Sequence, residues 1–183
     1  MTEAMSLTGK DALRSPSSFG AFSRLYHTAF PEQERIRLDE MVGLAPAMGL
    51  TLTAWYDGGT FVGLTVVCER ADANWFWYFA VEENLRGRGY GRHILGEITR
   101  RYATRPLILD IESPRQPSAN QAQRSRRYAF YLRNGFTDTG VENAYGGVEY
   151  AILQFGEPTL TDSQFRALLA ELFELWGELP PSE

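Results

Sequence analysis

Hydrophobic and polar residues alternate along the chain with the period of a helix in some segments and of a strand in others. Apolar side chains at helical spacing predict a helix over residues 17–30, which Pro31 ends. A less regular apolar stripe predicts a second helix over 32–45. A broad apolar face behind a Thr/Asp start predicts a last helix over 160–177.

Strands are expected in the central part of the chain. Two β-rich runs flank the sequence DGG at 57–59, and this turn chemistry predicts a hairpin of antiparallel strands. The next run, 74–81, is apolar on both alternating faces, as in a central strand covered on both sides. Further strands are expected at 107–112, near 136–141 and at 148–155.

Two more helices are expected between these strands. Apolar stripes predict helices that begin after the glycine-rich segment 85–91 and at Gln121, and Gly135 stands where a helix C-cap glycine belongs. A strand–helix–strand unit places its two strands parallel, whereas the hairpins are antiparallel. The order therefore predicts an α/β fold of the α+β type. We expect a mixed, mostly antiparallel central sheet of about six to seven strands with helices on both faces.

Composition limits the class of protein. The chain has 183 residues, of which 44% are hydrophobic, and this predicts one globular domain over 1–183. Its apolar runs are too short to span a membrane, and its start lacks the order of a signal peptide, so we expect a cytoplasmic protein. One cysteine, Cys68, and two separated histidines argue against disulfides and a metal site. The net charge of −5 argues against nucleic acid and membrane surfaces as partners.

The sequence LRGRGYG at 85–91 places three glycines and two arginines directly after the apolar run. Glycines between a strand and a helix leave backbone N–H groups unshielded at the positive end of the helix dipole, and that combination binds phosphate. Neither Gly-x-Gly-x-x-Gly nor Gly-Lys-Ser/Thr is present, which disfavours the common dinucleotide and nucleoside-triphosphate loops. The pattern that fits is Arg-x-x-Gly-x-Gly, formed by Arg86, Gly89 and Gly91.

This loop, preceded by FAVEEN and followed by RHILGEI, resembles the acyl-CoA pyrophosphate loop of the GNAT superfamily of N-acetyltransferases. The later segment RRYAFYLRNGF, at 126–136, resembles a second motif of the same family. The resemblance covers about residues 17–155. It implies a GNAT-like fold and acetyl-CoA as co-substrate, with no metal.

The resemblance also implies how the acetyl-CoA is held. The strand that ends at Val81 would hydrogen-bond the pantetheine arm through its backbone near Phe79 and Val81, as an added edge strand does. The loop would bind the pyrophosphate. The expected cofactor-binding residues are Phe79, Val81, Arg86, Gly87, Arg88, Gly89, Tyr90 and Gly91.

Transfer of an acetyl group to an amine needs an acid for the departing thiolate and a base for the amine. By resemblance Tyr131 occupies the position of the acid, with Tyr128 as the alternative. Asp110 and Glu112 alternate with apolar residues near the end of their strand, so both carboxylates point to one face. We choose Glu112 as the base and expect Asp110 to pair with an arginine of 124–133, a role also open to Glu112; Glu34 is the alternative base.

The predicted function is N-acetyl transfer from acetyl-CoA to a primary amine by direct attack in a ternary complex. The acceptor would be a small-molecule or peptide amine, and no motif in the sequence identifies it. The alternative is a non-catalytic acyl-CoA-binding sensor with the same fold. A homodimer is left open.

Overall fold

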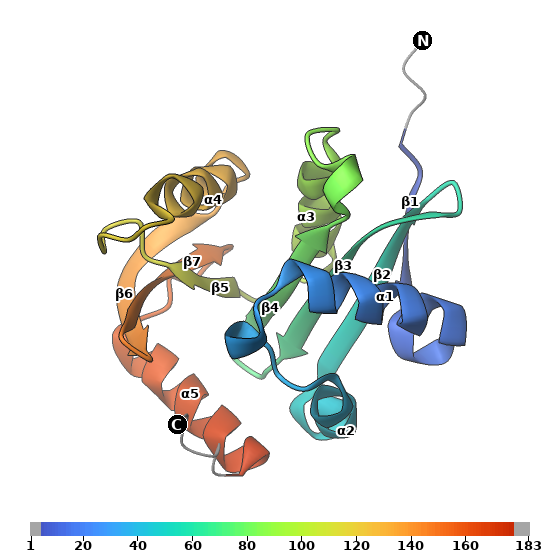
Figure 1. Cartoon of the computed structure of the whole chain (residues 1–183). Coiled ribbons are helices and arrows are strands. Elements are labelled where there is room, and N and C mark those ends of the chain that lie inside the picture. Colours follow the sequence, from blue (N-terminus) through green and yellow to red (C-terminus); the bar gives the residue numbers. More distant parts are fainter. Residues whose placement is uncertain (1–4, 178–183) are drawn as a thin grey trace. The chain divides into compact units, whose positions relative to one another are not determined.

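The computed structural model describes residues 5–177 and contains a seven-stranded sheet of order β1-β2-β3-β4-β5-β7-β6 (Figure 1). Its strands are β1 (Leu7–Asp11), β2 (Leu50–Asp57), β3 (Thr60–Glu69), β4 (Asn74–Val81), β5 (Leu107–Glu112), β6 (Thr137–Tyr145) and β7 (Val148–Phe155). Its α-helices are α1 (Pro16–Ala29), α2 (Leu38–Met48), α3 (Tyr90–Arg101), α4 (Gln121–Arg133) and α5 (Asp162–Trp176). Short 3-10 helices are η1 (Ala12–Arg14), η2 (Glu32–Glu34) and η3 (Glu83–Leu85). β4 and β5 pair in parallel, whereas the pairs of β1 with β2, β2 with β3, β5 with β7 and β6 with β7 are antiparallel. The predicted mixed, mostly antiparallel sheet is confirmed.

The chain divides into two compact units. The first comprises the residues up to Glu69 together with Phe76–Ile98, and the second comprises Arg70–Trp75 together with the residues from Thr99 onward. A division into compact units can occur within one domain, so the prediction of a single domain stays a prediction.

In the first unit, α1 and α3 cover opposite faces of the strands. The hydroxyl of Tyr56 in β2 donates to Ser18 Oγ of α1 (3.1 Å), so Tyr56 faces α1. Successive residues of a strand point to opposite faces, which turns Trp55 the other way. On that face Gly63 of β3 pairs with Trp55, and a Cβ at Gly63 would lie 3.1 Å from Ile94 Cδ1 of α3. The prediction of helices on both faces is thus met within this unit.

Two elements of the first unit differ from the sequence prediction. The second helix was expected over 32–45, but α2 begins only at Leu38, because the backbone of 34–36 is held in another conformation. The Tyr78 hydroxyl donates to the Glu34 carbonyl (2.9 Å) and accepts from the Ile36 amide (3.1 Å), and both bonds compete with a helix. β1 was not predicted at all; it pairs with β2 along its whole length.

The second unit is built from β5, β7 and β6, with α4 packed beside β5 and β6 and α5 beside β6. α4 is followed by Gly135 with φ of 88°, the left-handed conformation of the predicted C-cap glycine. α5 begins with a capping box, in which Thr161 Oγ1 accepts from the Gln164 amide and Gln164 Oε1 accepts from the Thr161 amide.

β6 contains a bulge. Asp138 pairs with Leu153 and Glu142 pairs with Ala151, so the three residues 139–141 lie opposite Ile152 alone and β6 has two extra residues with respect to β7. Thr139 Oγ1 donates to the Ile152 carbonyl (2.8 Å) and accepts from the Val141 amide (3.1 Å), which satisfies backbone groups that lie outside the ladder.

Candidate functional site

The predicted phosphate loop connects the end of β4 to the start of α3 in the first unit, at the top of Figure 1. Gly87 and Gly89 have φ of 76° and 91°, a region that side chains other than glycine rarely adopt. Gly89 stands just before α3, and its carbonyl accepts the first backbone bond of the helix, from the His93 amide (3.2 Å). The amides of the first helical turn therefore have no partner within the helix, and they point outward with the positive end of its dipole.

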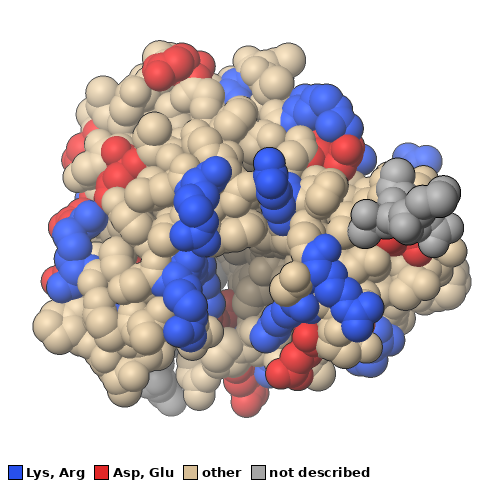
Figure 2. Space-filling model, turned by 90° about the horizontal axis from the view of Figure 1, so that it is seen from above, with Lys and Arg blue, Asp and Glu red and all other residues tan. Residues whose placement is uncertain are grey.

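The loop is exposed and positively charged. Arg86, Arg88 and Arg92 are all exposed, and Figure 2 shows that basic side chains outnumber acidic ones on the face that contains this loop. Arg86 Nε donates to the Val81 carbonyl (3.4 Å), which holds this arginine against the end of β4. Guanidinium groups and unpaired backbone amides are the donors that phosphate requires, so the residues present fit a pyrophosphate.

The strand that precedes the loop is less completely buried than its sequence predicts. Along β4, Trp77, Phe79 and Val81 are only half-buried, whereas the residues between them are buried. The expectation of a strand covered on both faces is therefore wrong for this half of β4. This face of β4 is therefore partly accessible to solvent.

Tyr131 and Asp110 lie in the second unit. Tyr131 is 8% exposed, and its burial raises its pKa to about 12, with Arg127 lowering and Asp110 raising the pKa as smaller effects. Within residues 5–177 no hydrogen bond engages its hydroxyl. Asp110, on β5, accepts from Trp75 Nε1 (2.8 Å), and burial raises the pKa of its carboxyl more than this bond lowers it. The negative charge of the Asp110 carboxylate is thus one of the causes that raise the pKa of the Tyr131 hydroxyl.

The two carboxylates of β5 have different surroundings. Asp110 and Glu112 are both half-buried at alternate positions, as predicted. The pairing expected of Asp110 is found at Glu112 instead, where Arg124 Nη2 donates to Oε1 (2.7 Å) and Asn120 Nδ2 donates to Oε2 (3.2 Å). Arg124 is 7% exposed, so this ion pair is shielded from water. The role of Glu112 as base stays a prediction, and its contacts are those of a residue that holds the loop 113–120.

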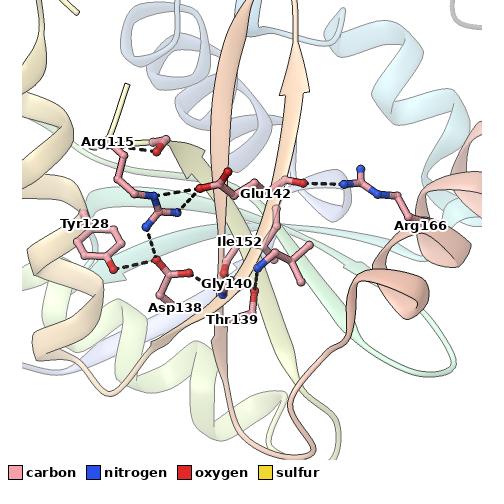
Figure 3. A network of polar contacts seen from close by, with 10 residues as sticks. Arg115, Tyr128, Asp138, Thr139, Gly140, Glu142, Ile152 and Arg166 are labelled. Atoms are coloured by element: carbon pink, nitrogen blue, oxygen red, sulfur yellow. Dashed lines mark hydrogen bonds and ion pairs between the residues drawn. The ribbon is translucent and has the colours of Figure 1, made fainter. Parts of the chain in front are cut away.

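Tyr128, the alternative acid, belongs to a separate polar network (Figure 3). Its hydroxyl donates to Asp138 Oδ2 (2.9 Å), which also accepts from Arg115 Nη1 (2.9 Å). Arg115 further donates to Glu142 across the bulge of β6. Burial alone would raise the pKa of Asp138, but the bonds from Arg115, Gly140 and Tyr128 outweigh it and lower the pKa. The Tyr128 hydroxyl is thus already donated to a carboxylate.

The remaining residues considered in the sequence analysis lie elsewhere, and the role of Glu34 as alternative base stays a prediction. Glu34 is exposed in η2. Cys68 is buried in β3, and its thiol donates to the Met48 carbonyl (3.1 Å), as expected of an inert cysteine. Within residues 5–177 there is no group of three or more His, Cys, Asp or Glu arranged to hold a metal ion. In the same part of the chain, none of the helices combines the length and apolar character that crossing a membrane requires.

A family model matches part of the chain. Residues 49–138 match the model of the acetyltransferase (GNAT) domain, a segment that runs from the start of β2 into β6. This segment includes the whole loop 86–91 and the residues Asp110, Glu112 and Tyr131. Over this segment, just under half of the chain, the sequence therefore matches the GNAT acetyltransferase domain. No curated protein sequence matches this chain.

Solved structures confirm the fold over most of the chain. A protein described as a GNAT-family acetyltransferase from Bacteroides thetaiotaomicron superimposes with a TM-score of 0.74 at 19% identity, covering 92% of this chain and 96% of that one. The ribosomal-protein-S18-alanine N-acetyltransferase of Escherichia coli gives 0.58 at 15% identity, with 82% and 93% covered. An aminoglycoside 6'-N-acetyltransferase complexed with coenzyme A gives 0.62 at 18% identity, with 82% and 96% covered.

Proposed function

We propose that this protein is an acetyl-CoA-dependent N-acetyltransferase that transfers an acetyl group to a primary amine in a ternary complex. The observation that carries the proposal is the loop 86–91, which combines two left-handed glycines, the start of helix α3 and exposed arginines inside the segment that matches the GNAT domain. The coenzyme A bound to the aminoglycoside acetyltransferase of the same fold supports this choice of donor.

The loop and the end of β4 would hold the donor. Arg86, Arg88 and the amides of residues 87–91 would bind the pyrophosphate, and the half-buried face of Phe79 and Val81 would lie along the pantetheine arm. When bound, acetyl-CoA supplies the acetyl group as a thioester.

A base must first make the amine nucleophilic. A lysine-like amine has a pKa of about 10.4, so its deprotonation at pH 7 costs about 4.6 kcal/mol. We propose Asp110 as this base in place of Glu112. Its carboxylate faces no arginine partner in the ion pairs of residues 5–177, and its raised pKa brings it toward the working pH of a general base. Glu112, in contrast, would have to give up its bond to Arg124.

Tyr131 would supply the proton that the departing thiolate needs. Asp110 takes one proton from the ammonium group and releases it to water, which leaves a neutral amine. As this amine forms the N–C bond and the C–S bond breaks, the nitrogen loses a second proton to Asp110 and Tyr131 donates its hydroxyl proton to the departing sulfur. The raised pKa of Tyr131 keeps that hydroxyl protonated at neutral pH, so it is ready to donate. Proton exchange with water then restores both side chains.

The test is a thiol-release assay across a library of amines, with calorimetric titration of coenzyme A as the companion measurement. We expect coenzyme A to bind and at least one amine to release free thiol from acetyl-CoA. Binding without thiol release from any amine would favour the acyl-CoA sensor. Absence of coenzyme A binding would refute both. The cytoplasm as compartment, and a homodimer, stay predictions.

A further inference from the structure

Three segments of the first unit meet at the start of α3. Asp57 is the last residue of β2, at the tip of the hairpin, and its carboxylate is shared by two donors. Its Oδ2 accepts from the Tyr90 hydroxyl and its Oδ1 from the Ser6 amide, each at 2.9 Å. Tyr90 is the first residue of α3, and Ser6 immediately precedes β1. The Asp57 side chain therefore connects the hairpin, by hydrogen bonds, to the residue before β1 and to Tyr90 in the loop 86–91.

The same N-terminal segment lies against the loop itself. The methyl carbon of Met5 lies 3.6 Å from the position that a Cβ would take at Gly89, and His93 Nδ1 lies at the same distance from it. His93 Nδ1 is also 3.0 Å from the Gly89 carbonyl. On its open side Gly89 therefore lies near Met5 and His93, and the next residue in the chain is Tyr90, whose hydroxyl donates to Asp57.

Such contacts matter because glycine-rich loops have many backbone conformations open to them. Two glycines in left-handed conformations and exposed arginines leave the loop many alternatives, and ordering them on binding costs affinity. A carboxylate close to an anion site is also unfavourable by charge alone. Its presence therefore needs a compensating role, and its two hydrogen bonds indicate which one.

We infer that Asp57 is a positioning residue for coenzyme A, which fixes the first turn of α3 through Tyr90 and thereby holds the loop 86–91 ready for pyrophosphate. The inference rests on the proposed function, because it assumes that the loop binds coenzyme A. Asp57 lies outside the glycine motif, and its position in the sequence, before Gly58-Gly59, indicates only a turn.

Charge and positioning predict opposite results, and this makes the inference testable. The variants are Asp57→Ala and Tyr90→Phe, with Glu83→Gln as the matched control. Glu83 is an exposed carboxylate in η3, next to the loop, and its substitution removes the same charge without touching Tyr90. Titration calorimetry with coenzyme A gives the Kd of each variant, and thermal unfolding confirms that each is folded.

If Asp57 positions the loop, Asp57→Ala and Tyr90→Phe should each weaken coenzyme A binding about five- to tenfold, the worth of one ordinary hydrogen bond at a partly exposed position. The double variant should bind no more weakly than the weaker-binding single variant, because both substitutions remove the same Tyr90–Asp57 hydrogen bond. In the thiol-release assay, KM for acetyl-CoA should rise while kcat at saturation stays unchanged. Glu83→Gln should bind as tightly as wild type or more tightly.

Tighter binding by Asp57→Ala, parallel to Glu83→Gln, would show that Asp57 acts only through its charge and would overturn the inference. Unchanged binding by Tyr90→Phe would overturn it as well, and this variant removes one hydroxyl only, so it tests the idea even if Asp57→Ala unfolds. In both cases wild type still binds coenzyme A and the proposed function stands. A wild type that fails to bind coenzyme A refutes the proposed function, and this inference falls with it.

Discussion

The substitution Glu112→Gln tests whether the Glu112 carboxylate is structural or acts as the catalytic base. The contacts of Glu112 determine how much stability the substitution should cost. Arg124 is 7% exposed and its Nε already lacks a partner, so the Glu112 carboxylate provides the main compensation for its charge. The amide of glutamine keeps one acceptor oxygen, but its NH₂ group must face either Arg124 Nη2 or Asn120 Nδ2, both of which are donors. One charged hydrogen bond is lost and a buried cation loses its counterion.

The expected loss is about 2–4 kcal/mol of unfolding free energy, between the value of one charged hydrogen bond and that of a broken buried pair. In a chain of 183 residues this lowers Tm by about 5–15 °C. The assay is urea and thermal unfolding at pH 7, with turnover measured well below the lowered Tm. Glu149→Gln is the control, since Glu149 is an exposed carboxylate of the adjacent strand β7 and should change stability by less than about 0.5 kcal/mol.

If Glu112 holds its loop, the variant is unstable but retains the acidic limb of its pH–rate profile in the fraction that is folded. A double variant that also replaces Arg124 by leucine should lose less stability than the two single changes added together, because the lone buried charge is gone. The reasoning is refuted if Glu112→Gln matches the stability of Glu149→Gln while turnover collapses and the acidic limb disappears. That result would return the base to Glu112.

The other predictions concern the proposed chemistry. Asp110→Asn should abolish most turnover yet stabilise the fold at pH 7, because the pKa of Asp110 is raised on folding; the gain should vanish as pH falls toward the ordinary pKa of the carboxyl, which unfolding curves at several pH values check. Tyr131→Phe should bind coenzyme A normally but lower kcat by about 10²-fold or more, with Tyr128→Phe as the mild control. Wild type should lose stability as pH rises from 10 to 12, since the folded pKa of Tyr131 is about 12, and Tyr131→Phe should lose less. Arg86→Ala should weaken coenzyme A binding by about 1.5–3 kcal/mol, and equal Kd values in calorimetry at low salt would count against a phosphate contact. Gly89→Ala should weaken it through the strain of a φ of 91°, measured in the same titrations, although a Cβ there meets no close contact.

Local sequence patterns predicted those parts of the fold that local forces decide. α1 begins at Pro16 behind Ser15, whose Oγ accepts from the Ser18 amide, and proline is favoured at the first helical position. The position of the phosphate loop was predicted from the three glycines and two arginines within residues 85–91. Each of these elements could be predicted because a few neighbouring residues determine its conformation.

The remaining parts depend on contacts between residues far apart in the chain. β1 has one strongly apolar residue, Leu7, and becomes a strand only by pairing with β2 some fifty residues later. The start of α2 is delayed by the Tyr78 hydroxyl, which belongs to another element. Likewise, the alternation along β5 placed Asp110 and Glu112 on one face, but no pattern in the sequence tells which of them meets Arg124.

The bulge of β6 has a consequence for the behaviour of the protein at high concentration. β6 is the last strand of the sheet, and a straight outer strand with free backbone groups is a template on which a second chain can add and begin to aggregate. Residues 139–141 interrupt that row, and the charged residues Asp138 and Glu142 flank the interruption. Arg115 holds both carboxylates, so the bulge is fixed rather than free to straighten. The network that anchors the loop after β5 thus also protects the sheet from intermolecular strand pairing.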